Sequence, residues 1–116
     1  LFPEGTRTRD GALGEFKRGV MLLIKRAPVH VHIVPVAMEG AFDVWPTGAS
    51  RPKPHGHIAI DVGRPWTRDE LLQDGPDKAL DLMRATIDNM RLALRTDMRR
   101  RTGGRYPAAG RGDSPL

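Results

Sequence analysis

The most informative part of this sequence is its opening stretch, LFPEGTRTRDG, at residues 1–11. Two apolar residues followed by Pro3 are typical of a buried strand at its end, so the chain should leave a sheet there. Gly5 and the RDG at residues 9–11 are turn formers, and they predict a polar loop that continues to Gly14. We therefore expect a strand end followed by a loop.

The same loop gathers groups that suit the binding of an anion. Gly5 lets the backbone approach a ligand closely, and Thr6 with nearby N–H groups can donate hydrogen bonds. Arg7 offers a planar guanidinium that matches phosphate oxygens. Glu4 can pair with Arg7 and hold it in one orientation. The alternative interpretation is a local ion pair between Glu4 and Arg7 in a surface loop.

The remainder of the chain predicts the order helix, strand, strand, helix. A helix is expected over 15–27, where apolar residues recur at helical spacing before Pro28. Residues 29–38 are apolar and mostly β-branched, which predicts a buried strand interrupted at Pro35. A second strand is expected over 57–62, and a long helix should begin at Pro76.

Three further features complete the expected secondary structure. Thr67 and Glu70 have the spacing of a capping box for a short helix. One apolar stripe should run down the long helix through Leu80, Met83, Ile87, Met90 and Leu94. Residues 41–54 read as a loop rich in Pro and Gly, and residues 101–116 as a disordered basic tail.

Composition limits the class of protein. The chain has 116 residues, of which 39% are hydrophobic and 28% are charged, and these values suit at most one globular domain. There is no cysteine, which excludes disulfides and thiolate metal sites. The net charge of +5 favours anionic partners such as phosphate groups, acidic lipid surfaces or nucleic acid. No apolar run approaches the roughly 20 residues of a membrane-spanning helix.

Three segments, in this order, resemble the glycerolipid acyltransferases, which acylate glycerol 3-phosphate and 1-acylglycerol 3-phosphate. FPEGTR at residues 2–7 is similar to the family's phosphate-binding block, FKRG at 16–19 to the segment after it, and IVPVAMEG at 33–40 to its fourth block. The resemblance covers residues 1–66. It implies an α/β fold class: the C-terminal part of a layered αβα acyltransferase fold with a mixed sheet, incomplete in this chain, with residues 1–100 in that domain.

The resemblance also implies a phosphate site. The residues that it assigns to the substrate phosphate are Glu4, Gly5, Thr6, Arg7 and Lys17. Lys17 would add a mobile ammonium near the start of the following helix, where the helix dipole is positive. The alternative for Lys17 is a solvated, charged helix face.

The fourth block implies a wall of the acyl groove. Its candidate residues are Val34, Pro35 and Val36, which would otherwise only pack the core. Phe42 and Trp45 are candidates for a lining or a lid, but apolar loop residues usually pack locally, and we favour that interpretation.

The family's catalytic block, H-x-x-x-x-D, is missing from this sequence. None of the four histidines has an Asp five positions later. In the family the His takes the proton of the acceptor hydroxyl and the Asp orients the His. We expect this block to precede Leu1, so that the chain is a fragment with no catalytic residue, inactive alone. The pairs His30/His32 and His55/His57 lack further ligands at motif spacing, so no metal is expected.

The implied reaction moves a fatty acyl group to the free hydroxyl of 1-acylglycerol 3-phosphate, which makes phosphatidic acid for phospholipid biosynthesis. Acyl-CoA or acyl-carrier protein would be the co-substrate, with no other cofactor. The implied place is the cytoplasmic face of a membrane, and its anionic surface is an expected partner.

Two other classes of function remain open. The first is a non-catalytic module that binds phosphate or anionic lipid. The second is a basic nucleic-acid-associated protein that uses the arginines after residue 98, namely Arg99, Arg100, Arg101, Arg105 and Arg111. Because only Tyr106 is available there for stacking on bases, specific recognition of nucleic acid is not expected.

Overall fold

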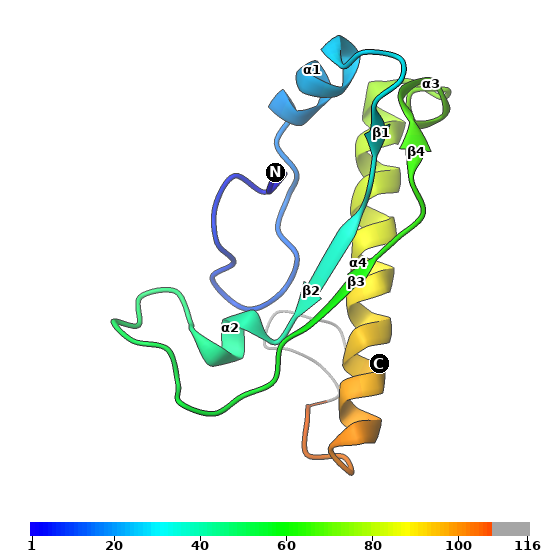
Figure 1. The fold of residues 1–116 in the computed structure, drawn as a ribbon. Coiled ribbons are helices and arrows are strands. Elements are labelled where there is room, and N and C mark those ends of the chain that lie inside the picture. Colours follow the sequence, from blue (N-terminus) through cyan, green and yellow to red (C-terminus); the bar gives the residue numbers. More distant parts are fainter. Residues whose placement is uncertain (108–116) are drawn as a thin grey trace.

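The computed structural model describes residues 1–107 (Figure 1). Its elements are α1 (Gly19–Arg26), β1 (His32–Ile33), β2 (Val36–Glu39), α2 (Ala41–Val44), β3 (Ala59–Val62), β4 (Trp66–Thr67), α3 (Arg68–Leu71) and α4 (Pro76–Arg101). β1 pairs with β4 and β2 with β3, both antiparallel. Helices and strands are thus mixed as expected, but the described residues form two small antiparallel sheets and show no layered fold with a mixed sheet.

The strand expected over residues 29–38 is divided at Pro35. Pro35 has no N–H to donate, so the pairing of the two strands is interrupted there. Its carbonyl still accepts a hydrogen bond from the Gly63 N–H at 2.8 Å. A Cβ on Gly63 would lie 2.7 Å from the Pro35 ring, so a glycine opposite the proline keeps the two chains close. β1–β2 and β3–β4 therefore make one bent ribbon with a break in the middle.

Helix α4 lies along this ribbon over most of its length (Figure 1). The helix begins as the sequence predicts, with Pro76 in its first turn after Gly75, whose φ is +93°. The expected capping box is also present: the Glu70 N–H donates to the Thr67 hydroxyl and the Thr67 N–H to the Glu70 carboxylate. In the part of the chain described, no helix is both long and apolar enough to span a bilayer.

The apolar core lies at the end of the molecule where α1, α3 and the start of α4 meet. It is made of Phe16, Val20, Met21, Ile24, Leu71, Ala79 and Met83. The helical spacing of Val20 and Ile24 puts both on the face of α1 that packs inward. The helix starts at Gly19, later than expected, and the Lys17 N–H before it donates to the Pro3 carbonyl at 2.7 Å.

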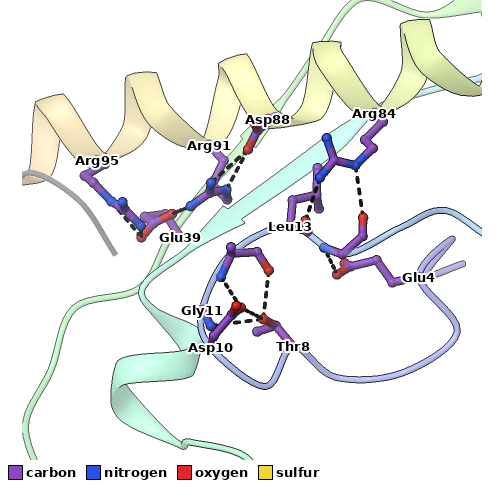
Figure 2. A network of polar contacts seen from close by, with 12 residues as sticks. Glu4, Thr8, Asp10, Gly11, Leu13, Glu39, Arg84, Asp88, Arg91 and Arg95 are labelled. Atoms are coloured by element: carbon purple, nitrogen blue, oxygen red, sulfur yellow. Dashed lines mark hydrogen bonds and ion pairs between the residues drawn. The ribbon is translucent and has the colours of Figure 1, made fainter. Parts of the chain in front are cut away.

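The other end of α4 is held by a buried cluster of charges (Figure 2). Glu39 on β2 is 4% exposed, and Arg91 and Arg95 on α4 are 4% and 2% exposed. The Arg95 Nη2 lies 2.7 Å from Glu39 Oε1, and the Arg91 Nη1 lies 3.2 Å from Oε2. Arg91 also donates to Asp88 at 2.8 Å. Such burial is tolerated because each charge has opposite charges and hydrogen bonds around it.

Tyr106 completes this cluster from beyond the end of α4. Its hydroxyl donates to Glu39 Oε1 at 2.8 Å, and its residue is 8% exposed. Burial, together with the Glu39 carboxylate, raises the pKa of the Tyr106 phenol above its ordinary range. The phenol is therefore a hydrogen-bond donor at any physiological pH.

Several expectations need correction at the ends of the chain. Leu1 and Phe2 are 88% and 77% exposed and do not form a buried strand end. Helix α4 continues to Arg101, and Tyr106 then packs inside, so the tail expected to be disordered from residue 101 is built into the fold as far as residue 107. The rest of that segment, including Arg111, lies outside the described residues.

Within residues 41–54, expected as a loop, Ala41–Val44 form the short helix α2.

One face of the β2–β3 ribbon is apolar and exposed. Val36 stands opposite Val62, and Met38 stands opposite Ile60. These four side chains are 42–63% exposed, whereas the alternate residues Ala37 and Glu39 of β2 are buried. Because side chains alternate along a strand, β2 presents one face to α4 and leaves the other uncovered.

Candidate functional site: a loop closed by Glu4 and Arg84

The predicted phosphate loop is closed by Glu4. Its Oε2 accepts a hydrogen bond from the Gly14 N–H at 2.8 Å, which joins the two ends of the loop (Figure 2). A Cβ on Gly14 would lie 3.0 Å from this oxygen, so glycine leaves room for the carboxylate. Gly5 has φ +69°, and its N–H donates to the Phe2 carbonyl at 3.0 Å, which closes a turn.

The far side of the loop is fixed by its own side chains. The Thr8 hydroxyl accepts from the Gly11 N–H at 3.0 Å and donates to the Ala12 carbonyl at 2.7 Å. Asp10 accepts from the Ala12 N–H at 3.0 Å (Figure 2). Short polar side chains that bond to nearby backbone in this way are typical of ordered turns. The loop is therefore held in one shape before any ligand binds.

Arg7 is oriented by α2 and not by Glu4, which corrects the predicted pairing. Its Nη2 donates to the Trp45 carbonyl at 2.6 Å, and its Cζ lies 5.7 Å from the centre of the Trp45 ring. Thr47 donates to the Thr8 carbonyl at 2.6 Å and ties the same two segments together. Among residues 1–107, Trp45 is the hydrogen-bond partner of the exposed Arg7 guanidinium, so most of its five N–H donors remain for a ligand.

The Lys17 side chain lies beside the loop. A Cβ on Gly5 would lie 3.3 Å from the Lys17 Cγ, so the Lys17 stem lies against the Gly5 backbone. The backbone N–H of Lys17 also bonds to the Pro3 carbonyl at 2.7 Å. Thr6, between Gly5 and Arg7, is exposed. The structure thus brings Gly5 and Lys17 into contact.

Arg84 is the residue that sequence reasoning missed. From α4, its Nη2 donates to the Leu13 carbonyl at 2.8 Å and its Nε to the Gly14 carbonyl at 3.2 Å (Figure 2). Glu4 accepts a hydrogen bond from the N–H of the same Gly14. Gly14 is thus held by Glu4 at its N–H and by Arg84 at its carbonyl. The available signal was weak: Arg84 is a cation that directly follows Met83 of the apolar stripe.

Replacing Arg84 should loosen this loop. We expect Arg84→Ala to speed amide hydrogen exchange at Gly14 and Lys17 about tenfold or more, because hydrogen bonds from a charged group are worth about 1.5–3 kcal/mol. Exchange followed by NMR measures this. Lys78→Ala, an exposed cation on the same helix, is the control. Equal exchange in the Arg84 variant and the parent would show that Arg84 does not hold the loop.

The other candidates of the predicted site have mixed positions. Val34 and Val36 are 42% and 49% exposed and accessible, but Pro35 between them is buried and packs near Gly63. Phe42 packs against the predicted phosphate loop: a Cβ on Gly11 would lie 3.0 Å from its ring. Nowhere in residues 1–107 do three His, Asp or Glu side chains gather as a metal site would require.

Comparison with known proteins finds one family model and several distantly similar relatives. Residues 1–39 match the family model described as Acyltransferase. The chloroplastic 1-acyl-sn-glycerol-3-phosphate acyltransferase of Arabidopsis thaliana is 38% identical over 65 residues, which are 56% of this chain and 18% of that protein. The 1-acyl-sn-glycerol-3-phosphate acyltransferase of Limnanthes douglasii is 43% identical over 54 residues, which are 47% of this chain and 18% of that protein.

The shared region is short on both sides of the comparison. This chain spans less than a fifth of the length of the curated relatives that it matches. No solved structure is significantly similar to it. The matched family segment contains the whole loop from Glu4 to Gly14, together with Lys17 and β2. Residues 1–39 therefore carry the signature of the Acyltransferase family, and about half of the chain is distantly similar to 1-acyl-sn-glycerol-3-phosphate acyltransferases.

Proposed function

We propose that this chain is the acceptor-binding part of an enzyme that transfers a fatty acyl group to 1-acylglycerol 3-phosphate. The donor is acyl-CoA or acyl-carrier protein, and the product is phosphatidic acid. The loop from Glu4 to Arg7, with Lys17, binds the phosphate of the acceptor. The observation that carries this proposal is the exposed guanidinium of Arg7, held by the Trp45 carbonyl at 2.6 Å beside a loop that is already ordered.

A preordered loop makes phosphate binding useful for catalysis. Holding the phosphate fixes the direction of the acceptor's free hydroxyl relative to the acyl thioester that it attacks. Binding energy from a part of the substrate that does not react is thereby used to lower the barrier of the reacting part. In this proposal the positive charge of Arg7 binds the phosphate. Trp45 orients the Arg7 side chain, and Glu4 and Arg84 hold the loop.

The apolar face of the β2–β3 ribbon suits the acyl chain of a substrate. Val36 and Met38 on β2, with Ile60 and Val62 on β3, offer a continuous apolar surface, and Val34 is exposed next to it. Each CH₂ group that such a surface removes from water contributes about 0.8 kcal/mol. We propose this face as the wall of the acyl groove, with Pro35 as its support and not as part of its lining.

The chemical step is not assigned to this chain. None of its histidines stands in the H-x-x-x-x-D pattern, and the shared region is only 18% of the length of the relatives. We propose that the residues that deprotonate the acceptor hydroxyl belong to the rest of the enzyme. The 116 residues alone then bind phosphate without transferring acyl groups, whereas measurable acyl transfer by them would contradict this part of the proposal.

The phosphate site is tested by titrating the chain with glycerol 3-phosphate in a calorimeter. We expect Arg7→Ala to weaken binding about tenfold or more, because a charge-assisted hydrogen bond to phosphate is worth about 1.5–3 kcal/mol. Arg9→Ala is the matched control: it removes the same charge from an exposed position of the same loop.

The result with the control decides between a site and a general attraction of charges. If Arg9→Ala weakens binding as much as Arg7→Ala, net charge alone explains the affinity and the proposed site is wrong. Binding that falls steeply with salt and is stronger for nucleic acid than for glycerol 3-phosphate would favour the nucleic-acid alternative. A complete protein that binds lysolipid but transfers no acyl group would favour the non-catalytic module.

A further inference from the structure

One hollow of the described surface adjoins the end of α2. Its volume is about 580 Å³, which is within the range of sites for small organic molecules. It is formed by the end of α2, the loop before β3 and the segment that follows α4. The residues that line it are Asp43, Val44, Lys53, His55, Gly56, His57, Thr102, Arg105, Tyr106 and Pro107.

The walls of this hollow are set by close backbone packing. The Lys53 N–H donates to the Val44 carbonyl at 2.7 Å, which fixes the loop against α2. A Cβ on Gly56 would overlap the Val44 side chain, and a Cβ on Gly40 would overlap the carbonyl of His57. Both glycines thus allow the chain to approach α2 more closely than other residues would. These contacts fix the loop before β3 against α2, and with it one wall of the hollow.

The charges of the hollow are mostly positive. Lys53 and Arg105 are cations, and Asp43 is the acid among the described lining residues, which also include His55 and His57. Within residues 1–107 no hydrogen bond or ion pair engages the side chains of Lys53, His55 or His57, and Arg105 uses its Nε on the Thr102 carbonyl at 3.1 Å. Two cations and one carboxylate give these lining residues a net positive charge, which favours an anionic ligand.

We propose that this hollow is a second anion site, which binds the phosphate group of an organic phosphate through Lys53 and Arg105. Lys53 supplies a compact charge and Arg105 a planar pair of N–H donors, the two kinds of group that bind phosphate in proteins. The site is separate from the loop at Arg7, because different residues line it. It goes beyond the proposed acceptor site and does not depend on it.

The phosphate can come from two sources, and two probes distinguish them. Coenzyme A represents a phosphorylated carrier of nucleotide size, and glycerol 3-phosphate represents a lipid headgroup. Calorimetric titration of the chain with each probe is compared between the parent and the double variant Lys53→Ala/Arg105→Ala. We expect the double variant to lose at least tenfold in affinity for one of the two probes, and that probe identifies the source.

The matched control is Arg51→Ala, which removes an exposed cation from the same loop at a position that does not line the hollow. Arg51→Ala should change neither affinity by more than about twofold. Circular dichroism checks that each variant is folded, and the single variant Lys53→Ala serves if the double variant is not. The proposal is wrong if the parent binds neither probe, if the folded Lys53 variants bind both as the parent does, or if Arg51→Ala has the same effect.

The same titrations separate this proposal from the acceptor site. Arg7→Ala should leave binding in the hollow unchanged, and Lys53→Ala should leave binding at the loop unchanged. If Arg7→Ala weakens binding and the Lys53 and Arg105 substitutions do not, the acceptor site is supported and the second site is wrong. If the Lys53 and Arg105 substitutions weaken binding and Arg7→Ala does not, the second site is supported and the acceptor site is wrong.

Discussion

Glu39→Ala should lower the free energy of unfolding by about 3–5 kcal/mol, because it leaves two buried guanidiniums without the carboxylate between them. Arg91 and Arg95 both bond to Glu39, at 3.2 Å and 2.7 Å, and Tyr106 donates to the same carboxylate at 2.8 Å. This is a large part of the stability of a domain of this size. Urea denaturation, followed by circular dichroism, measures the change.

A surface carboxylate with the same arrangement provides the control. Asp97 also bonds to two arginines, Arg100 and Arg101, each at 2.6 Å. Both of these guanidiniums are exposed, and solvent screens the interaction. The hydrogen bond from Arg100 lowers the pKa of the Asp97 carboxyl, yet Asp97→Ala should move the urea midpoint only slightly. If the two variants are equally stable, the buried cluster does not hold α4 on the ribbon.

Gly40→Ala should destabilise the chain by about 3 kcal/mol or more. Gly40 has φ +95°, a conformation that costs an L-residue about 1–2 kcal/mol. A Cβ there would also overlap the backbone carbonyl of His57 and lie 3.3 Å from the Met98 methyl. Backbone cannot move aside as a flexible side chain does, so overpacking adds about 1–3 kcal/mol. Thermal unfolding of the variant gives the measurement.

Gly48 separates the two contributions. Its φ of +94° matches that of Gly40, but a Cβ there would meet nothing within 4 Å. Gly48→Ala should therefore lose only the conformational part, about 1–2 kcal/mol. An equal loss in both variants would mean that contact between Gly40 and His57 contributes nothing, and that the loop before β3 is not fixed against α2.

Local signals predicted the elements whose causes are local. Pro76 after Gly75, the Thr67–Glu70 capping box and the interruption at Pro35 all follow from the chemistry of one or two neighbouring residues. The apolar pattern did not indicate the late start of α1 at Gly19, because Phe16 has helical spacing with Val20 and yet precedes the helix. The exposed Leu1 and Phe2 show that an apolar pair before proline does not by itself make a buried strand end.

The side of α4 that faces the ribbon was predicted only in part. Met83 is buried as the apolar stripe requires, but further along the helix the buried residues are Arg91, Arg95 and Met98, none of which belongs to the predicted stripe. The burial of the two arginines depends on Glu39, more than fifty positions earlier, so no pattern within the helix could reveal it. The burial of Tyr106 could not be predicted either, because its hydroxyl also bonds to Glu39, which is distant in sequence.

The candidate phosphate site shows the same division. FPEGTR predicted which residues belong to the loop and which family the segment resembles, and the family is confirmed over residues 1–39. The partners of those residues were not predictable: Glu4 bonds to Gly14, Arg7 to Trp45, and Arg84 holds the loop from α4. Residue types are visible in sequence, whereas their pairing, across 10 positions for Glu4 and Gly14 and 38 for Arg7 and Trp45, is a property of the fold.

A crystal structure of the chain with glycerol 3-phosphate tests the central claim most directly. We expect phosphate oxygens within about 2.7–3.1 Å of the Arg7 guanidinium N–H groups, with the Lys17 ammonium beside them and the Glu4–Gly14 hydrogen bond intact. Glycerol 3-phosphate bound elsewhere, with Arg7 still turned only toward Trp45, would contradict the assignment of this loop as the acceptor's phosphate site.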